Sequence, residues 1–188
     1  MDPTAAGLSE ARSTERSVMD QATKEMLEGL KQAMQAERHG QSFYQMAAQS
    51  TADPTGREVF AQLAREEQSH FEFLAAHYRS LLEQGVPAAG AKLDAVGALS
   101  ATSPIFSESL RARIKEAHFE MSALSIAVQL ELNALSHYRE LARTAPLAEV
   151  QRFFQQLSEW ESGHYHALLA QQQSLQESYW EANGFARF

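Results

Sequence analysis

An internal repeat constrains the fold of this chain more than any other feature of its sequence. Residues of the second half match residues of the first half at a constant offset of 94, and no gap is needed. The matched pairs include Leu30 and Leu124, Glu37 and Glu131, Tyr44 and Tyr138, Glu67 and Glu161, and His70 and His164. Because a repeat of this kind is one supersecondary unit used twice, we expect two similar halves related by a pseudo-twofold axis.

Each half reads as a pair of helices. Apolar residues recur at helical spacing, and a Pro-containing break divides each half in two, at Asp53-Pro54 and at Ala145-Pro146. Asp53 is suited to cap the helix that follows, and Pro54 fits its first turn because that position needs no N–H. We therefore predict an all-α four-helix bundle of two repeated helical hairpins joined by a long crossover.

The boundaries of the predicted elements follow from the breaks and from the apolar pattern. We expect a flexible, at most weakly helical arm over residues 1–22, a bundle over 23–178 and an aromatic tail over 179–188 that packs on the bundle or on a second copy. The four long helices are predicted at about 23–50, 54–84, 122–143 and 147–178, and Gly85 and Pro87 are expected to end the second of them. A short helix is expected at about 108–117, after a connection rich in Ala, Gly, Ser and Pro.

Composition excludes several classes of protein. The formal net charge of the 188 residues is −8, which disfavours a nucleic-acid backbone as partner. The chain has no cysteine, which excludes disulfides, thiolate nucleophiles and cysteine-bound metal centres. No apolar run approaches the length of a membrane span, and the polar N-terminus lacks a signal-peptide core. We expect a cytoplasmic protein without nucleic-acid or membrane partners.

The repeat carries a set of metal-ligating residue types. Each half supplies one glutamate from its first helix and a Glu-x-x-His pair from its second, and residues three apart share a helix face. A glutamate among apolar neighbours is costly to bury unless it is paired or bound to metal. The pseudo-twofold axis would bring both sets together, giving a ligand set suited to two divalent ions. The candidate metal ligands are Glu37, Glu67, His70, Glu131, Glu161 and His164.

These residues lie in four segments that resemble the rubrerythrin branch of the ferritin-like superfamily. The segments are AERHGQSFY, REEQSHFEFL, QLELNALSHY and EWESGHYHALL, and the resemblance spans about residues 27–175. It implies a ferritin-like bundle with two iron ions, for which Mn or Zn could substitute. It also implies that Glu67 and Glu161 bridge the ions, and that Glu37, Glu131, His70 and His164 are terminal ligands.

Tyr44 and Tyr138 are candidate supporting residues of the same site. The resemblance implies that they hydrogen-bond to ligand carboxylates, and each lies two helical turns after its glutamate, on the same face. The alternative is that both are ordinary core tyrosines. We interpret the other five histidines and Trp160 as surface or packing residues.

The chain departs from the family in two respects. Typical rubrerythrins carry a further glutamate one turn after the third-helix ligand, where this chain has Ala134. They also carry a rubredoxin domain with cysteine-bound iron, which a cysteine-free chain cannot have. The first departure puts redox-linked ligand switching in doubt, and the second implies a separate electron donor.

The sequence leaves several functions open. The first hypothesis is a di-iron oxidoreductase of peroxidase or ferroxidase type, which acts on peroxide or O₂ with an external electron-donor protein. The second is a non-catalytic iron-binding, storage or sensing protein that uses the same site. A quinone-hydroxylating monooxygenase and a purely structural bundle rank lower. By resemblance we expect a homodimer.

Overall fold

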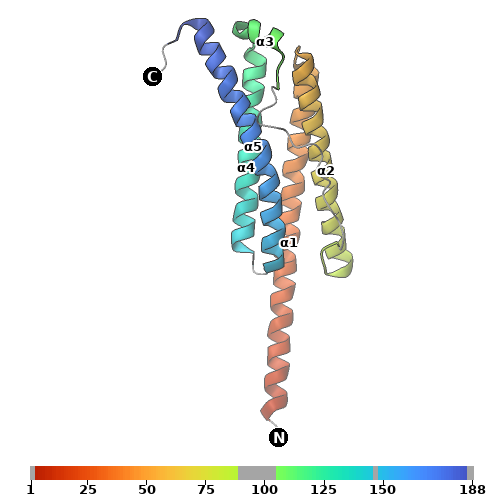
Figure 1. The fold of residues 1–188 in the computed structure, drawn as a ribbon. Helices are drawn as coiled ribbons and strands as arrows, with labels where there is room; N and C mark the ends of the chain where they lie inside the picture. Colours follow the sequence, from red (N-terminus) through yellow and green to blue (C-terminus); the bar gives the residue numbers. More distant parts are fainter. Residues whose placement is uncertain (1–2, 89–104, 146–147, 186–188) are drawn as a thin grey trace.

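The structure, a computed structural model, describes residues 3–88, 105–145 and 148–185. All regular elements in these segments are helical, in two pairs of long helices with a short helical connection between them (Figure 1). The elements in chain order are α1 (Pro3–Ser50), α2 (Pro54–Gln84), α3 (Glu108–Ala112), the 3-10 turn η1 (Ile114–Glu116), α4 (His118–Thr144) and α5 (Ala148–Asn183). The predicted ferritin-like, all-α bundle of two hairpins is confirmed.

The packing of the hairpins follows from the spacing of buried residues along the helices, which α1 illustrates. α1 packs along α2, and α4 packs along α5, as the repeat predicts. The buried residues of α1 recur at alternating steps of four and three, which keeps one stripe of a helix against its neighbours. This stripe holds Met26, Leu30, Ala33, Glu37, Gly40, Tyr44 and Ala47. A glutamate therefore occupies a position where the bundle expects an apolar residue.

The capping residues around α2 behave as the sequence predicts. The side chain of Asp53 accepts a hydrogen bond from the backbone N–H of Gly56 at 2.8 Å, and Pro54 is the first residue of the helix. At the other end Gly85 adopts a left-handed conformation with φ of 72°, and its N–H donates to the carbonyl of Leu81. Glycine takes this conformation without the steric penalty of a Cβ, so it ends the helix cleanly.

Asp53 also fastens α2 to α3. Its carboxylate accepts a hydrogen bond from the backbone N–H of Ser107 at 3.1 Å and another from the Ser107 hydroxyl. Ser107 in turn caps α3 through the N–H of Leu110. One buried carboxylate thus satisfies donors at the starts of two helices.

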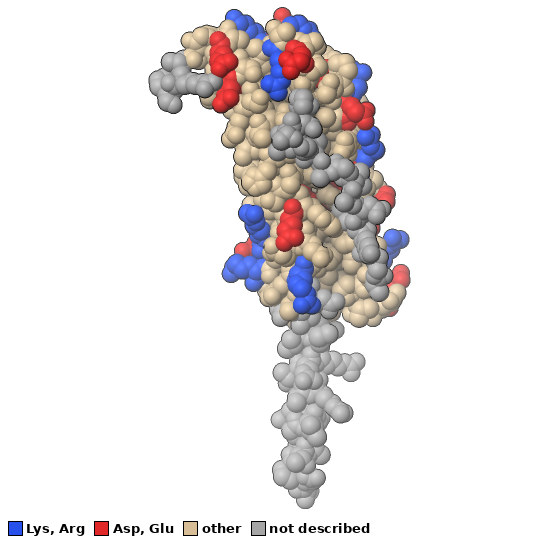
Figure 2. Space-filling view, viewed as in Figure 1, with Lys and Arg blue, Asp and Glu red and all other residues tan. Residues whose placement is uncertain are grey.

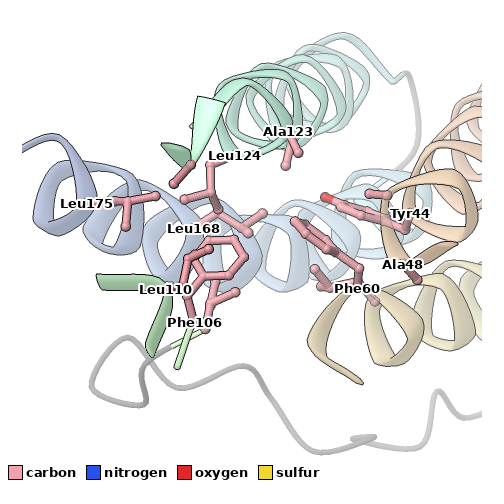
Figure 3. Close-up of a cluster of buried hydrophobic side chains, with 14 of the residues drawn as sticks. Tyr44, Ala48, Phe60, Phe106, Leu110, Ala123, Leu124, Leu168 and Leu175 are labelled. Carbon is pink, nitrogen blue, oxygen red and sulfur yellow. The ribbon is translucent and has the colours of Figure 1, made fainter. Parts of the chain in front are cut away.

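Two apolar clusters fill the bundle, one toward each end. The first contains Tyr44, Phe60, Phe106, Leu124 and Leu168, and Figure 3 shows these side chains meeting between the helices. The second contains Leu30, Leu74, Tyr138, Phe154 and Leu157. On each long helix one candidate carboxylate lies in sequence between the segments that supply the two clusters: Glu37 on α1, Glu67 on α2, Glu131 on α4 and Glu161 on α5. The bundle therefore has a polar layer enclosed by two apolar ones.

The ends of the chain differ from the expected boundaries. α1 begins at Pro3, well before the expected start near residue 23, and this first part runs beyond the other helices (Figure 1). Ala5, Ala6, Leu8, Glu10 and Ala11 are helix-favouring residues, which accounts for the extension. α5 continues to Asn183, five residues past the expected end at 178. Tyr179 packs on the first apolar cluster, whereas Trp180 and Phe185 are exposed.

The charged side chains and the hydropathy of the helices can be described for the same segments. On the face in Figure 2, basic and acidic side chains are interspersed, and blue does not form a continuous patch. Across residues 3–88, 105–145 and 148–185, none of the helices combines the length and the apolar character needed to cross a bilayer.

We expect Asp53→Ala to lower the free energy of unfolding by about 1–2 kcal/mol, because it removes a cap and leaves N–H groups without an acceptor. Urea unfolding at pH 7 measures this change. Glu58→Ala is the control, since Glu58 is exposed and pairs with exposed Arg65, and a surface pair of this kind contributes little. Equal losses in both variants would contradict the role of Asp53.

The same contact predicts a pH dependence of stability. Burial opposes ionisation of Asp53, but hydrogen bonds from Ser107 and Gly56 outweigh it and lower the pKa of Asp53. A depressed folded-state pKa stabilises the protein above the unfolded-state pKa, about 3.9. This contribution is lost as the pH falls through the folded-state pKa. The stability gap between the unsubstituted protein and Asp53→Asn should therefore narrow below about pH 3.9.

Candidate metal centre

Six side chains that are far apart in the sequence converge in the polar layer of the bundle. They are Glu37 from α1, Glu67 and His70 from α2, Glu131 from α4, and Glu161 and His164 from α5. Each residue exposes 8 % of its surface or less, so water does not solvate these charges freely. The structure thus brings together all six candidate ligands.

The six residues fall into two overlapping groups of metal-ligating atoms. In one group, Glu37, Glu67 and His70 each offer an atom, and these atoms lie within 4.8 Å of one another. In the other, Glu67, Glu131, Glu161 and His164 do the same. Glu67 belongs to both groups, which is the geometry expected of a carboxylate shared by two ions.

Each histidine lies close to two of the candidate carboxylates. His70 Nδ1 lies 3.3 Å from an oxygen of Glu37 and 3.3 Å from an oxygen of Glu161. His164 Nδ1 lies 3.8 Å from an oxygen of Glu131 and 3.8 Å from the other oxygen of Glu161. Glu161 therefore contacts both imidazoles, as a second shared carboxylate would.

The two tyrosines cross-link the halves. Tyr44, from the first hairpin, donates a hydrogen bond to Glu131 of the second, and Tyr138 donates to Glu37 of the first. Burial, reinforced by the neighbouring carboxylates, raises the pKa of both phenols, so both remain donors. Glu131 and Glu37 are thereby each held by a side chain from the opposite hairpin.

Two of the buried carboxyls bind protons more readily than usual. Burial raises the pKa of Glu67 well above its ordinary value, and the charges of Glu37, Glu131 and Glu161 add to the shift. Burial and the charge of Glu161 raise the pKa of Glu131 to about 7. Like charges in a dry interior repel, so protons or cations must neutralise them.

Glu161 and the histidines shift in the opposite sense. Burial opposes the charge on Glu161, but hydrogen bonds with His164 and His70 outweigh it and hold its pKa below the usual range. Burial also opposes charge on His70, but Glu161 and Glu37 raise its pKa to about 10. The pKa of His164 is raised for the same reason, by Glu131 and Glu161. Positive charge on the imidazoles thus neutralises part of the negative charge of the carboxylates. Metal ions can supply this positive charge instead.

A cleft of about 340 Å³ between α1 and α4 opens onto this layer. Four of the candidate ligands line it together with small and polar residues of the two helices. The lining includes Gln32, Ala36, Glu37, His39, Gly40, Glu67, Glu131, Ala134, His137 and Glu161. A small molecule can therefore reach carboxylates that are otherwise enclosed.

The sequence of the chain matches the model of a known protein family. A sequence model of the rubrerythrin family matches residues 13–121, more than half of the chain. The chain belongs to the rubrerythrin family. Among curated proteins and solved structures, no match to the chain is found. The matched segment contains Glu37, Glu67 and His70, while the second half of this rubrerythrin-type site rests on the internal repeat and on the geometry above.

These 188 residues contain no cysteine, so this rubrerythrin-like chain holds no cysteine-bound iron of the rubredoxin type. Ala134 lines the cleft at the place where typical rubrerythrins carry a further glutamate. Its repeat partner is Gly40, on the opposite wall of the same cleft. Because these two positions hold glycine and alanine, no longer side chain occupies this part of the cleft next to the carboxylates.

The donor set of this rubrerythrin fits two divalent ions. Glu67 Oε1, Glu161 Oε1 and His164 Nδ1 are buried and, among the residues that the structure describes, have no partner in hydrogen-bond geometry. A buried polar atom without a partner costs about 1–3 kcal/mol, and these three atoms all belong to candidate ligands. Ligation would satisfy them, so the residues present suit a di-metal centre.

Two contributors to the site escaped the sequence analysis. Glu66, next to Glu67, is 2 % exposed, and its Oε2 lies 3.0 Å from His164 Nε2. Gly40 is required by close approach, since a Cβ there would lie 2.8 Å from Glu67 Oε2. The repeat held a signal for Glu66, because the position 94 residues later is Trp160, and the match fails there. Nothing in the sequence gave the spacing between α1 and α2 that makes Gly40 necessary.

The remaining histidines behave as surface or packing residues. His39, His118 and His166 are exposed. His77 is buried against Phe73 and Phe153 and accepts a hydrogen bond from the N–H of Ala88. His137 is partly buried beside Tyr138 and lines the cleft.

We expect Glu67→Ala or Glu161→Ala to abolish the binding of two ions per chain, because each change removes a carboxylate that contacts both halves of the site. Metal analysis after Fe(II) loading and gel filtration measures the stoichiometry. Glu72→Ala, which removes an exposed carboxylate from the same helix as Glu67, should bind two. Two tightly held ions in either ligand variant would show that its carboxylate is not shared.

Gly40→Ala separates folding from metal binding. Alanine favours a helix over glycine by about 1 kcal/mol, so the unfolding free energy of the metal-free variant should not fall. Metal affinity should fall roughly tenfold or more, because the new methyl group displaces Glu67.

Gly163→Ala is the matched control for this change. A Cβ at Gly163 meets nothing within 4 Å, so this variant should bind metal like the unsubstituted chain. Unchanged affinity in Gly40→Ala, measured by calorimetric titration, would contradict the close contact with Glu67.

Proposed function

We propose that this rubrerythrin is a di-iron oxidoreductase that reduces peroxide or O₂ with electrons from a separate donor protein. The observation that carries the proposal is the pair of donor groups that share Glu67, buried between apolar clusters and reached through one cleft. Membership of the rubrerythrin family supports iron as the metal.

The chemistry of the donors supports the same metal. Imidazole and carboxylate ligands suit Fe(II), and they also accept Mn or Zn, which are the substitutes to test. Four carboxylates balance the charge of two divalent ions, so the loaded layer is close to neutral when both imidazoles are neutral. Two ferrous ions, when bound, supply the two electrons that reductive cleavage of an O–O bond requires.

The side chains of the protein hold and shield this centre. Glu37 and Glu131 are fixed by Tyr138 and Tyr44, so the terminal ligands are oriented before any substrate arrives. The apolar clusters on both sides keep bulk water out, which strengthens electrostatic interactions in the layer. The cleft between α1 and α4 is the route by which a small oxidant reaches the carboxylates.

The 188 residues have no cysteine with which to hold a rubredoxin-type iron, which supports a separate protein as the source of the electrons. We propose that this donor docks near the bundle and re-reduces the centre after each turnover. A homodimer and a cytoplasmic setting remain part of the proposal by resemblance to the family.

The test of the proposed function is a stopped-flow reaction of Fe(II)-loaded protein with hydrogen peroxide under anaerobic conditions. We expect rapid oxidation with one peroxide consumed for every two ferrous ions, and repeated turnover when a reductant is supplied. Glu67→Ala should lose the rapid phase. A slow oxidation, at the rate of Fe(II) in buffer, would contradict the proposal.

One observation favours the alternative of an iron-handling protein. Four carboxylates line the cleft, so the same opening that admits an oxidant can also admit and release iron. If this is the role, the protein binds Fe(II) reversibly and hands it to a chelator within minutes, without turning over peroxide. Multiple turnovers of peroxide with retained iron would reject it.

A further inference from the structure

The repeat is symmetrical in the candidate ligands and asymmetrical one residue away. Both glutamate–histidine pairs and both tyrosines have partners at the offset of 94, but Glu66 corresponds to Trp160. Each of these two residues precedes a shared glutamate, and each contacts the histidine of the opposite hairpin. The two halves of the centre therefore differ in the residue that contacts the imidazole from the opposite hairpin.

Behind His164 stands a carboxylate. Glu66 is 2 % exposed, its Oε2 forms an ion-pair contact of 3.0 Å with His164 Nε2, and this buried oxygen has no partner in hydrogen-bond geometry among the described residues. The other oxygen of Glu66 accepts a hydrogen bond from Gln62 at 2.8 Å, which fixes the carboxylate. Nδ1 of the same ring faces Glu131 and Glu161. The Nδ1 atom of His164 thus faces the candidate ligands Glu131 and Glu161, and its Nε2 atom faces Glu66.

Behind His70 stands an aromatic ring. The imidazole of His70 stacks with Trp160, with ring centroids 5.8 Å apart and planes at 17°. Within the described residues, both ion pairs of His70 use Nδ1, the nitrogen that faces Glu37 and Glu161. Stacking positions the ring but adds no negative charge to it.

This difference changes how strongly each imidazole holds a cation. When a metal ion binds Nδ1, the ring proton must sit on Nε2, which in His164 points to Glu66. A carboxylate in that position fixes the tautomer, orients the ring and makes its free nitrogen a better donor. Its charge also attracts the ion through the poorly screened interior.

We propose that Glu66 makes the two metal positions unequal, so that the position at His164 fills first and binds its ion more tightly than the position at His70. The inference rests on the proposed di-metal centre but not on its reaction with peroxide. It makes Glu66 a positioning residue, which acts on the metal through His164. The ion at His70 is then the more readily exchanged of the two.

The test is a titration of metal-free protein with Co(II), followed by its visible absorbance and by calorimetry. We expect two binding steps per chain, with the first at least tenfold tighter than the second. Glu66→Gln keeps the size of the side chain and removes its charge, so it should weaken the first step by about 10–100-fold and leave the second unchanged. Trp160→Phe, at the equivalent position of the other half, should leave the first step unchanged.

A double-mutant cycle identifies the position on which Glu66 acts. In a His70→Ala background one tight step should remain and should still weaken on Glu66→Gln. In a His164→Ala background the tight step should be missing, and Glu66→Gln should have no further effect. Circular dichroism of each variant verifies that the helices are intact.

The outcomes separate this inference from the proposed function. Two ions bound with equal affinity by the unsubstituted protein would overturn the inference without any variant. A tight step that Glu66→Gln leaves unchanged would overturn it as well, while the di-metal centre would stand. Unequal steps that depend on Glu66, in a protein that does not react with peroxide, would support the inference and count against the proposed oxidoreductase. Fewer than two ions in the unsubstituted protein would overturn both.

Discussion

Burial of like charges in the middle of the bundle is the constraint on which the rest of the structure depends. Glu37, Glu67, Glu131 and Glu161 occupy stripe positions that a helical bundle normally fills with apolar side chains, and each is almost inaccessible to water. Isolated carboxylates in such a place are strongly unfavourable, so the fold must supply compensating charge. Imidazolium groups and shared protons supply it without metal, and two divalent cations supply it more completely. The buried negative charge of the polar layer favours cation binding, and the geometry of the layer provides the ligands for it.

The layer is held by contacts that cross between the hairpins. Tyr44 and Tyr138 each bond to the glutamate of the other half, and Glu66 and Trp160 each meet the histidine of the other half. Neither hairpin can therefore complete its half-site alone. Crossed contacts of this kind make the geometry of the centre depend on the packing of all four helices, and the two apolar clusters above and below provide that packing. Glu66 and Trp160 occupy equivalent positions of the repeat but differ in chemistry, so the two halves of the centre are not alike.

Much of this arrangement was predictable from the sequence, because a duplicated helix pair with polar residues on its apolar stripe admits few folds. The repeat predicts the hairpins, Asp53 and Gly85 predict the ends of α2, and the Glu-x-x-His pairs predict which side chains meet. The long first helix was not predicted, since its early residues favour a helix without an apolar period. Gly40 and Glu66 were missed for another reason. Their roles depend on distances of about 3 Å between atoms on different helices. A sequence pattern contains no such distances.

Anomalous X-ray scattering at the iron edge, from crystals grown with Fe(II), tests the central claim most directly. The account predicts two peaks in each chain, separated by roughly 3.5–4 Å as in other two-metal sites. One peak should lie beside Glu37 and His70, the other beside Glu131 and His164, with Glu67 and Glu161 between them. A single peak, peaks held only by exposed acidic residues, or no bound iron would contradict the account.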